Sequence, residues 1–115
     1  MNTNLNQLFE NLSSAYRHNN LDAIFNLHHP YNELFNMGKD QLRTVLSNYE
    51  LDVSFENLNI LQEDEDVRIV RVSQITKKEN GPEFRDNEID MIVVLKPHND
   101  TIKILSTASI DTRFL

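Results

Sequence analysis

Hydrophobic positions divide the chain into a helical half and a β half. Over residues 4–18 they recur at spacings of three and four, the stripe of an amphipathic helix. The stripe comprises Leu5, Leu8, Phe9, Leu12, Ala15 and Tyr16. Asn20 is suited to cap a second short helix, which Pro30 ends at or before His29. A third helix is predicted over residues 38–48, where Asp40 favours the positive N-terminal end.

The pattern changes to a period of two from Tyr49 onward. Leu51, Val53 and Phe55 alternate with polar residues, and the alternation then slips at residues 58–61. A change of parity within one apolar stretch predicts a bulge or a bend in a long, curved strand. Residues 31–37 carry neither period, and we expect a short strand or an irregular turn there.

Turn signals separate the first strand from three more. The acidic run 63–66, Asn80-Gly81 and residues 97–100 are typical turns. They leave predicted strands at 67–78, 83–96 and 101–110. Three helices followed by a four-stranded antiparallel meander predict an α+β architecture in a single domain spanning 1–115.

Tight turns also predict which strand residues face each other. With Asn80-Gly81 as loop residues, Val72 faces Ile89 and Val70 faces Met91. With His98-Asn99 as the next loop, Leu95 faces Ile102, Val93 faces Ile104 and Ile89 faces Ala108. Apolar residues then face apolar residues on both sides of the third strand, which favours this register.

The same register gathers polar side chains on one face of the sheet. Asp90 is placed between Arg71 and Thr107. Glu88 is placed between Ser73 and Ser109. Two interpretations stay open: a solvated patch with a surface ion pair between Arg71 and Asp90, or the floor of a cavity under the helices. In a cavity, a carboxylate with a raised pKa can act as a general acid or base. Because Arg71 would keep Asp90 ionised, Glu88 is the better proton-sharing candidate.

Composition narrows the partners. Eleven basic and eighteen acidic residues give a net charge of −7, which disfavours nucleic acid and anionic membranes. The absence of cysteine excludes disulfides, thiol nucleophiles and zinc sites that use cysteine. No secretory signal or apolar stretch of ~20 residues is present, so a cytoplasmic location is expected.

Other candidate chemistry is sparse. His28 and His29 point about 100° apart on a helix and are poorly placed to chelate one metal, so a polar helix end is expected. Tyr16 either lines a cavity with its hydroxyl or packs in the core. No phosphate loop, nucleophile elbow or metalloprotease motif occurs, and we expect no metal or cofactor.

Three segments resemble the nuclear-transport-factor-2-like (cystatin-like, SnoaL-like) superfamily. They are YRHNNLDAIFNLHHP (16–30), GKDQLRTVL (38–46) and FRDNEIDMIVVLKPHNDTIKILSTASID (84–111). The FRDN-x-x-D stretch resembles one uncharacterised bacterial branch. The resemblance implies a conical half-barrel, in which a curved sheet wraps a long helix around a cavity open at one end. It also implies a homodimer formed through the sheet. The hairpin usual between the second and third helices is compressed here into 31–37.

Three functions compete on this basis, and the sequence leaves open whether the protein is an enzyme. The first is an accessory homodimer that binds a small molecule between helices and sheet, with Arg71, Ser73, Thr107, Ser109 and Tyr16 as ligand contacts. The second is an isomerase or dehydratase with Glu88 or Asp90 as general base. The third is a protein-interaction module that uses the sheet face.

Overall fold

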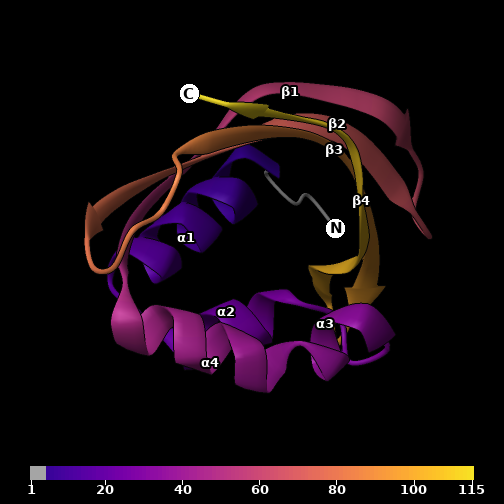
Figure 1. Cartoon of the computed structure of the whole chain (residues 1–115). Helices are drawn as coiled ribbons and strands as arrows, with labels where there is room; N and C mark the ends of the chain where they lie inside the picture. The colour runs from indigo at the N-terminus through magenta and orange to yellow at the C-terminus, as the bar shows by residue number, and fades with distance from the viewer. Residues whose placement is uncertain (1–4) are drawn as a thin grey trace.

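The computed structural model describes residues 5–115, with the helices first and the strands second. Helices α1 (Leu5–Arg17), α2 (Leu21–Leu27), α3 (Glu33–Met37) and α4 (Lys39–Asn48) precede strands β1 (Glu50–Glu63), β2 (Arg68–Asn80), β3 (Asn87–His98) and β4 (Thr101–Phe114). The strands form one antiparallel sheet in the order β1-β2-β3-β4. The predicted α+β class and meander are thereby confirmed. Figure 1 shows the sheet arching over α1, with α2, α3 and α4 beneath.

Asparagine caps define the two short helices. The Asn20 side chain accepts a hydrogen bond from the Ala23 N–H, as predicted. The Asn32 side chain accepts a hydrogen bond from the Phe35 N–H and caps the start of α3, which ends at its C-cap, Gly38. The prediction of a strand or irregular turn over 31–37 was therefore wrong, because a five-residue helix is too short to show a 3.6-residue period. Within 5–115 no helix is long and apolar enough to cross a bilayer.

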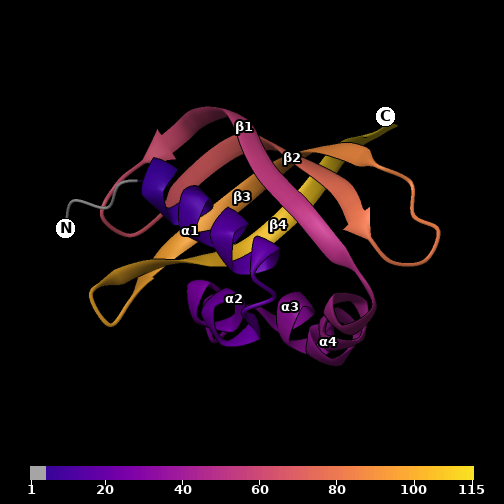
Figure 2. The ribbon, with the colours of Figure 1, turned by 90° about the vertical axis from the view of Figure 1, so that its left-hand side faces the viewer.

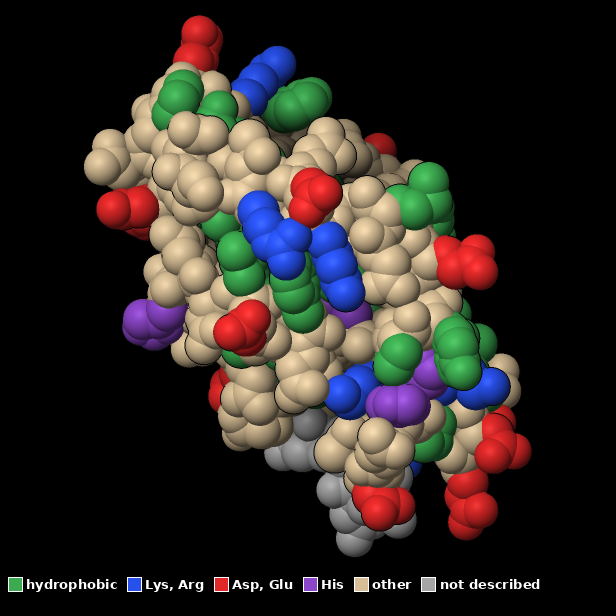
Figure 3. Space-filling view, turned by 90° about the horizontal axis from the view of Figure 1, so that it is seen from below, with side chains coloured by type: hydrophobic (Ala, Val, Ile, Leu, Met, Phe, Trp, Pro, Cys, Tyr) green, Lys and Arg blue, Asp and Glu red, His purple; other side chains and the backbone are tan. Residues whose placement is uncertain are grey.

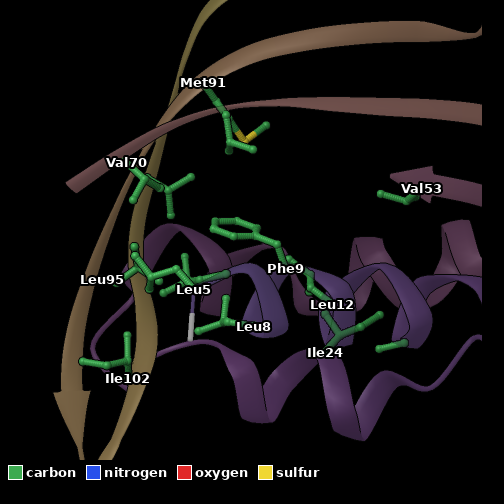
Figure 4. Close-up of a cluster of buried hydrophobic side chains, with 14 of the residues drawn as sticks. Leu5, Leu8, Phe9, Leu12, Ile24, Val53, Val70, Met91, Leu95 and Ile102 are labelled. Carbon is green, nitrogen blue, oxygen red and sulfur yellow. The ribbon is translucent and has the colours of Figure 1, made fainter. Parts of the chain in front are cut away.

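The hydrophobic core lies between α1 and the inner, helix-facing side of the sheet. Figure 2 shows α1 lying across one face of the sheet, and Figure 4 shows the apolar side chains of α1 facing those of the strands. The buried members from the sheet are Leu51, Val53, Val70, Val72, Met91, Val93, Leu95, Ile102 and Ile104. Ile24 of α2 is fully buried from below. The α1 stripe read from the sequence is thus the helix's core-facing side.

The predicted register between β2 and β3 was wrong by two residues. Val72 lies opposite Met91 and Val70 opposite Val93. The connection is longer than a two-residue hairpin, since β2 ends at Asn80 and β3 begins at Asn87. Because the error is an even number, each side chain stays on the predicted face of these two strands.

The register between β3 and β4 was also wrong. The loop residues are Asn99 and Asp100, both with positive φ (50° and 64°), as in a type I′ hairpin. Leu95 therefore lies opposite Ile104. Two register shifts follow, between Val94 and Leu95 and between Asp90 and Met91. Each inserts one residue into β4 and turns the strand over, because side chains alternate with a period of two.

The connection between β2 and β3 packs against the start of β1. Gly81 has φ +130°, and a Cβ there would lie 2.6 Å from the Asn48 carbonyl oxygen and 2.8 Å from a Tyr49 ring carbon. The Asp86 carboxylate accepts a hydrogen bond from the Lys78 N–H, 2.9 Å away. A side chain thus satisfies a backbone donor at the point where regular pairing of β2 with β3 has ended.

Candidate functional site

Two cross-strand ion pairs lie side by side on the outer face of the sheet, the face turned away from α1. Arg71 of β2 donates from Nε to Asp90 Oδ1 (3.0 Å) and from Nη2 to Asp90 Oδ2 (2.5 Å). Arg113 of β4 pairs with Glu88 of β3. The predicted pairing of Arg71 with Asp90 is therefore confirmed.

These pairs line an open hollow of about 460 Å³. We call it the polar hollow. Its lining residues are Asn57, Asn59, Arg71, Val72, Ser73, Glu88, Asp90, Asp111 and Arg113. They come from all four strands, so the hollow depends on the register of the whole sheet.

A bulge in β1 shapes one side of the polar hollow. The pairing of β1 with β2 jumps between Glu56 and Asn59, and Asn57 takes a left-handed conformation with φ 59°. Asparagine tolerates this conformation better than most residues. Asn57 and Asn59 line the hollow beside this jump. The bulge that the slipped alternation predicted is confirmed.

The electrostatics of the hollow favour the ionised form of Asp90. The hydrogen bond and charge of Arg71 lower the pKa of Asp90, against a smaller effect of burial, and Arg113 lowers it further. The hydrogen bond and charge of Glu88 raise the pKa of Arg113. Asp90 and Glu88 are only partly exposed, at 26% and 17% of their side chains. Both are engaged by arginine, so Asp90 does not have the raised pKa that a general acid or base at neutral pH requires.

The remaining predicted site residues divide between the two faces. Ser73 lines the polar hollow with Glu88 and Asp90. Thr107 lies opposite Val93 and Ser109 opposite Met91, on the helix-facing side. The prediction that Thr107 and Ser109 share a face with Asp90 was wrong, because the bulge at Leu105 turns this part of β4 over.

Tyr16 lies apart from this hollow. It is half-buried on α1 and packs against the core cluster. Burial raises the pKa of its hydroxyl. It is not among the residues that line the polar hollow.

Four polar residues that line the hollow were not predicted as site residues from the sequence. Asp111 and Arg113 return to the outer face because a second bulge, at Ile110, restores the parity. Asn57 and Asn59 lie where the slipped alternation marks a bulge. That slip was the one available signal, since nothing in the sequence marks the bulges of β4.

The two histidines expected at a polar helix end have structural contacts. The His28 ring stacks on Phe35, with 3.6 Å between centroids and 3° between planes. Burial lowers the pKa of His28. The buried His29 donates its backbone N–H to the Ile104 carbonyl, 2.8 Å away, and so ties the helices to β4. Within the described chain no three histidine or acidic side chains cluster to hold a metal.

A second open hollow, of about 620 Å³, lies between α1 and β1. Phe9, Ser13, Arg17, Phe55 and Leu58 are among its lining residues. The Arg17 Nε lies 2.7 Å from Asp52 Oδ1 at its edge. Phe9 and Phe55 pack with their ring centroids 5.1 Å apart. Its lining contains none of the residues that the sequence singled out for chemistry.

The fold and the site define a small α+β domain that carries an ion-paired polar hollow and lacks a recognisable catalytic set among residues 5–115. A match to a family model covers residues 7–115 and is described as the C-terminal domain of the anti-sigma-I factor RsgI9. The chain belongs to this family.

The solved structures include a relative in fold. The structure of Bdellovibrio bacteriovorus Bd1075 is similar with a TM-score of 0.68 and 13% sequence identity. The similarity covers 91% of this chain and 38% of that chain, so the chain spans well under half of Bd1075. At this identity the likeness concerns the fold alone. No curated protein matches the chain significantly.

Proposed function

We propose that this chain is an accessory binding domain of an anti-sigma-factor type protein and that the polar hollow is its ligand site. Membership of the RsgI9 C-terminal-domain family supports an accessory, regulatory role. The observation that carries the proposal is the pairing of Arg71 with Asp90 and of Arg113 with Glu88. Both carboxylates accept charge-assisted hydrogen bonds from arginine, and the lowered pKa of Asp90 makes that side chain poorly suited to accepting a proton.

The chemistry of the hollow favours a neutral or zwitterionic polar ligand. Arg71, Arg113 and the two asparagine amides offer donors, and Asp90, Glu88 and Asp111 offer acceptors. Two arginines against three carboxylates leave the lining close to neutral, in a chain whose net charge is −7. An anionic ligand would meet this overall negative charge, which disfavours it.

The arrangement of helices and sheet supports a nuclear-transport-factor-2-like half-barrel, the architecture that the sequence resemblance implies. The sheet curves over α1, and the shorter helices lie below (Figure 1). A cavity between helices and sheet, as in that architecture, is a separate expectation from the outer hollow. We place the ligand in the outer hollow because it gathers Arg71, Ser73, Glu88 and Asp90.

A titration followed by amide NMR tests the proposal. The panel comprises zwitterionic amino acids and dipeptides, neutral polyols and carboxylic acids. We expect a zwitterionic or neutral compound to shift the amides of Ser73 and Asn59. Arg71→Gln should abolish the shifts, whereas Arg43→Gln should leave them unchanged. Arg43 is a matched control, since it is 53% exposed, as Arg71 is 51%, and pairs with Asp40 on α4. Equal binding by both variants would exclude the hollow as the site.

A second candidate function is protein interaction through the helical underside. Tyr31, Leu34 and Met37 are exposed by 78%, 75% and 82% around α3. Lys39 and Arg43 lie over the Phe25 ring nearby, at 4.9 and 5.2 Å from its centroid. Figure 3 shows hydrophobic, cationic and histidine side chains together on this underside. Exposed apolar side chains grouped in this way are typical of contact surfaces.

The test of the second candidate is retention of a sigma factor in a pull-down. Leu34→Asp should lower the retained amount. Leu61→Asp serves as the control, because Leu61 is also exposed (50%) but lies at the far end of β1. Equal loss in both variants would argue against the underside.

A further inference from the structure

The second half of β4 is an open edge of the sheet. β4 is an outer strand, paired with β3 on one side. Its nine residues from Ser106 to Phe114 are all exposed. Within residues 5–115 no segment pairs with them on their other side. A long strand edge with free backbone groups is a template for another strand.

The first half of the same edge is covered. The Ile104 carbonyl accepts hydrogen bonds from the His29 N–H (2.8 Å) and the Asn32 side-chain amide (3.2 Å). His28 forms an isolated parallel bridge with Ile104. These contacts end at Ile104, two residues before the exposed stretch begins. The edge of β4 is therefore protected in its first half and open in its second half.

The open half is complementary to itself. Placing a second copy antiparallel about a two-fold axis at Thr112 sets Thr112 opposite Thr112. Asp111 then faces Arg113 of the second copy, and Ile110 faces Phe114. The symmetry makes the charged and the apolar pair twice. Ile110 and Phe114 are 49% and 56% exposed in the single chain. Cross-strand pairs of opposite charge and of large apolar side chains stabilise antiparallel sheets.

Neighbouring symmetric registers lack this match. An axis at Asp111 sets two carboxylates opposite each other, and an axis at Arg113 sets two guanidinium groups opposite each other. Like charges directly opposite are destabilising. An axis at Ile110 places Asp111 opposite Ser109 and Arg113 opposite Thr107, so neither residue faces a charge of the other copy. The Thr112 axis alone among these pairs opposite charges.

We propose that two copies of this chain associate through β4 of each, paired antiparallel about Thr112, into one continuous eight-stranded sheet. The proposal goes beyond the ligand site and does not depend on its occupant. It specifies the edge as the dimer interface, whereas the sequence resemblance implies the sheet. In the single chain the Thr112 N–H donates to its own Asp111 carboxylate, 3.0 Å away. In the dimer the Thr112 N–H would donate to a backbone carbonyl of the second strand instead. The Asp111 carboxylate would then be free to accept from Arg113 of the other copy.

The dimer also changes the polar hollow. Asp111 and Arg113 line the hollow from the β4 side, where the sheet ends. A second β4 at this edge continues the outer face, so its own Asp111 and Arg113 lie next to those of the first copy. The two hollows then adjoin across the axis, and each gains a wall that a single chain lacks.

Single-cysteine cross-linking tests the geometry, because the chain contains no cysteine of its own. Residues directly opposite each other have Cα atoms about 4.5–5.5 Å apart, which suits a disulfide. Thr112→Cys should form a covalent dimer under mild oxidation. Thr107→Cys is the matched control, exposed on the same strand and face. In the proposed register the two copies of residue 107 are ten positions, roughly 33 Å, apart and should not cross-link.

Charge exchange tests the register. Asp111→Lys sets lysine opposite arginine, and Arg113→Asp sets two carboxylates opposite each other, so each variant alone should associate about tenfold more weakly or more. Mixing the two variants restores opposite charges at both positions and should yield a heterodimer. Asp66→Lys, in the distant exposed turn between β1 and β2, controls for the change in net charge and should still dimerise.

Sedimentation and circular dichroism complete the test by measuring mass and fold. A monomer from about 1 µM to 1 mM overturns the proposal. So does a dimer in which Thr112→Cys fails to cross-link or Thr107→Cys cross-links equally, since the copies then meet elsewhere. A folded mixture of the charge variants that stays monomeric also overturns it.

Discussion

Arg71 and Asp90 form a two-pronged ion pair although they are diagonal neighbours in the sheet. Arg71 lies opposite Ile92, and Asp90 lies opposite Ser73. The guanidinium nevertheless contacts both carboxylate oxygens, at 3.0 and 2.5 Å. A planar fork on a long side chain reaches a diagonal partner that a shorter side chain would miss. The predicted contact between Arg71 and Asp90 is therefore present even though the register predicted for these strands was wrong.

Loss of the pair between Arg71 and Asp90 should make the stability of the fold depend less on pH in the acid range. Arg71 holds the pKa of Asp90 below its usual value, so the pair stabilises the fold above about pH 3.9, the ordinary carboxyl pKa. This contribution is lost as the pH falls through the depressed folded-state value. Arg71→Gln should therefore lower the melting temperature slightly at neutral pH and by less in acid. An equal decrease at both pH values would argue against the pair.

Gly81 should tolerate no side chain. Gly81→Ala combines φ +130° with a Cβ 2.6 Å from the Asn48 carbonyl oxygen, so the backbone must move. We expect about 1–3 kcal/mol less free energy of unfolding in urea. Gly38→Ala is the control, because Gly38 has φ −92° and its nearest contact would be 3.6 Å. Similar losses in both variants would show that the contact with Asn48 is not the cause.

Asn32 should matter more than Asn20, although both cap helices. Each accepts a hydrogen bond from the backbone N–H three residues on, at 3.1 Å. Asn32 is also buried and donates to the Ile104 carbonyl of β4. Loss of a cap costs roughly 1 kcal/mol, and loss of the second bond adds about 0.5–1.5 kcal/mol. In urea unfolding, Asn32→Ala should therefore lose more free energy of unfolding than Asn20→Ala.

His28 should make the fold sensitive to mild acid. Burial lowers the pKa of His28, the hydrogen bond that its ring Nδ1 donates to the Ile24 carbonyl opposes this, and the charge of Lys39 lowers the pKa further. The unfolded chain therefore takes up the proton first, and stability is lost as the pH falls below about 6.5. His28→Phe keeps a ring to stack on Phe35 and removes the titration. Between about pH 7.5 and 5 its melting temperature should fall less than that of the original chain.

His29 limits the size of that effect. Burial and the nearby His98 charge lower its pKa as well, so the variant should retain part of the dependence on pH. An unchanged pH profile in His28→Phe would assign the sensitivity to other groups.

The sequence predicted most helices and strands well because their periodic segments are long. The α1 stripe and the alternation in β1 repeat often enough to exclude other structures, and the Asn20 cap has a specific chemistry. The segment 31–37 was misjudged because α3 is only five residues long and is held by Asn32 through a contact with Ile104, 72 positions away. A contact so distant in sequence leaves no local pattern.

The candidate site was half predictable for a similar reason. Faces depend on whether a register error is even or odd, so Arg71, Ser73, Glu88 and Asp90 kept their common face through an error of two. Thr107 and Ser109 did not, because one inserted residue intervenes. Turn chemistry also misled, since both Asn80-Gly81 and His98-Asn99 read as two-residue loops. In the structure β2 and β3 are joined by a longer connection over residues 81–86, and the loop between β3 and β4 is Asn99-Asp100.

The two bulges of β4 cancel each other. The first bulge exchanges the two faces of the strand for a few residues, and the second exchanges them back. The side chains of residues 111–114 therefore point to the same faces as they would in a strand without bulges. Natural relatives that lose one of these residues must rebuild the tail, whereas those that lose both can keep it. Insertions and deletions in this strand should therefore be inherited in pairs, and strand length among relatives should vary by two more readily than by one.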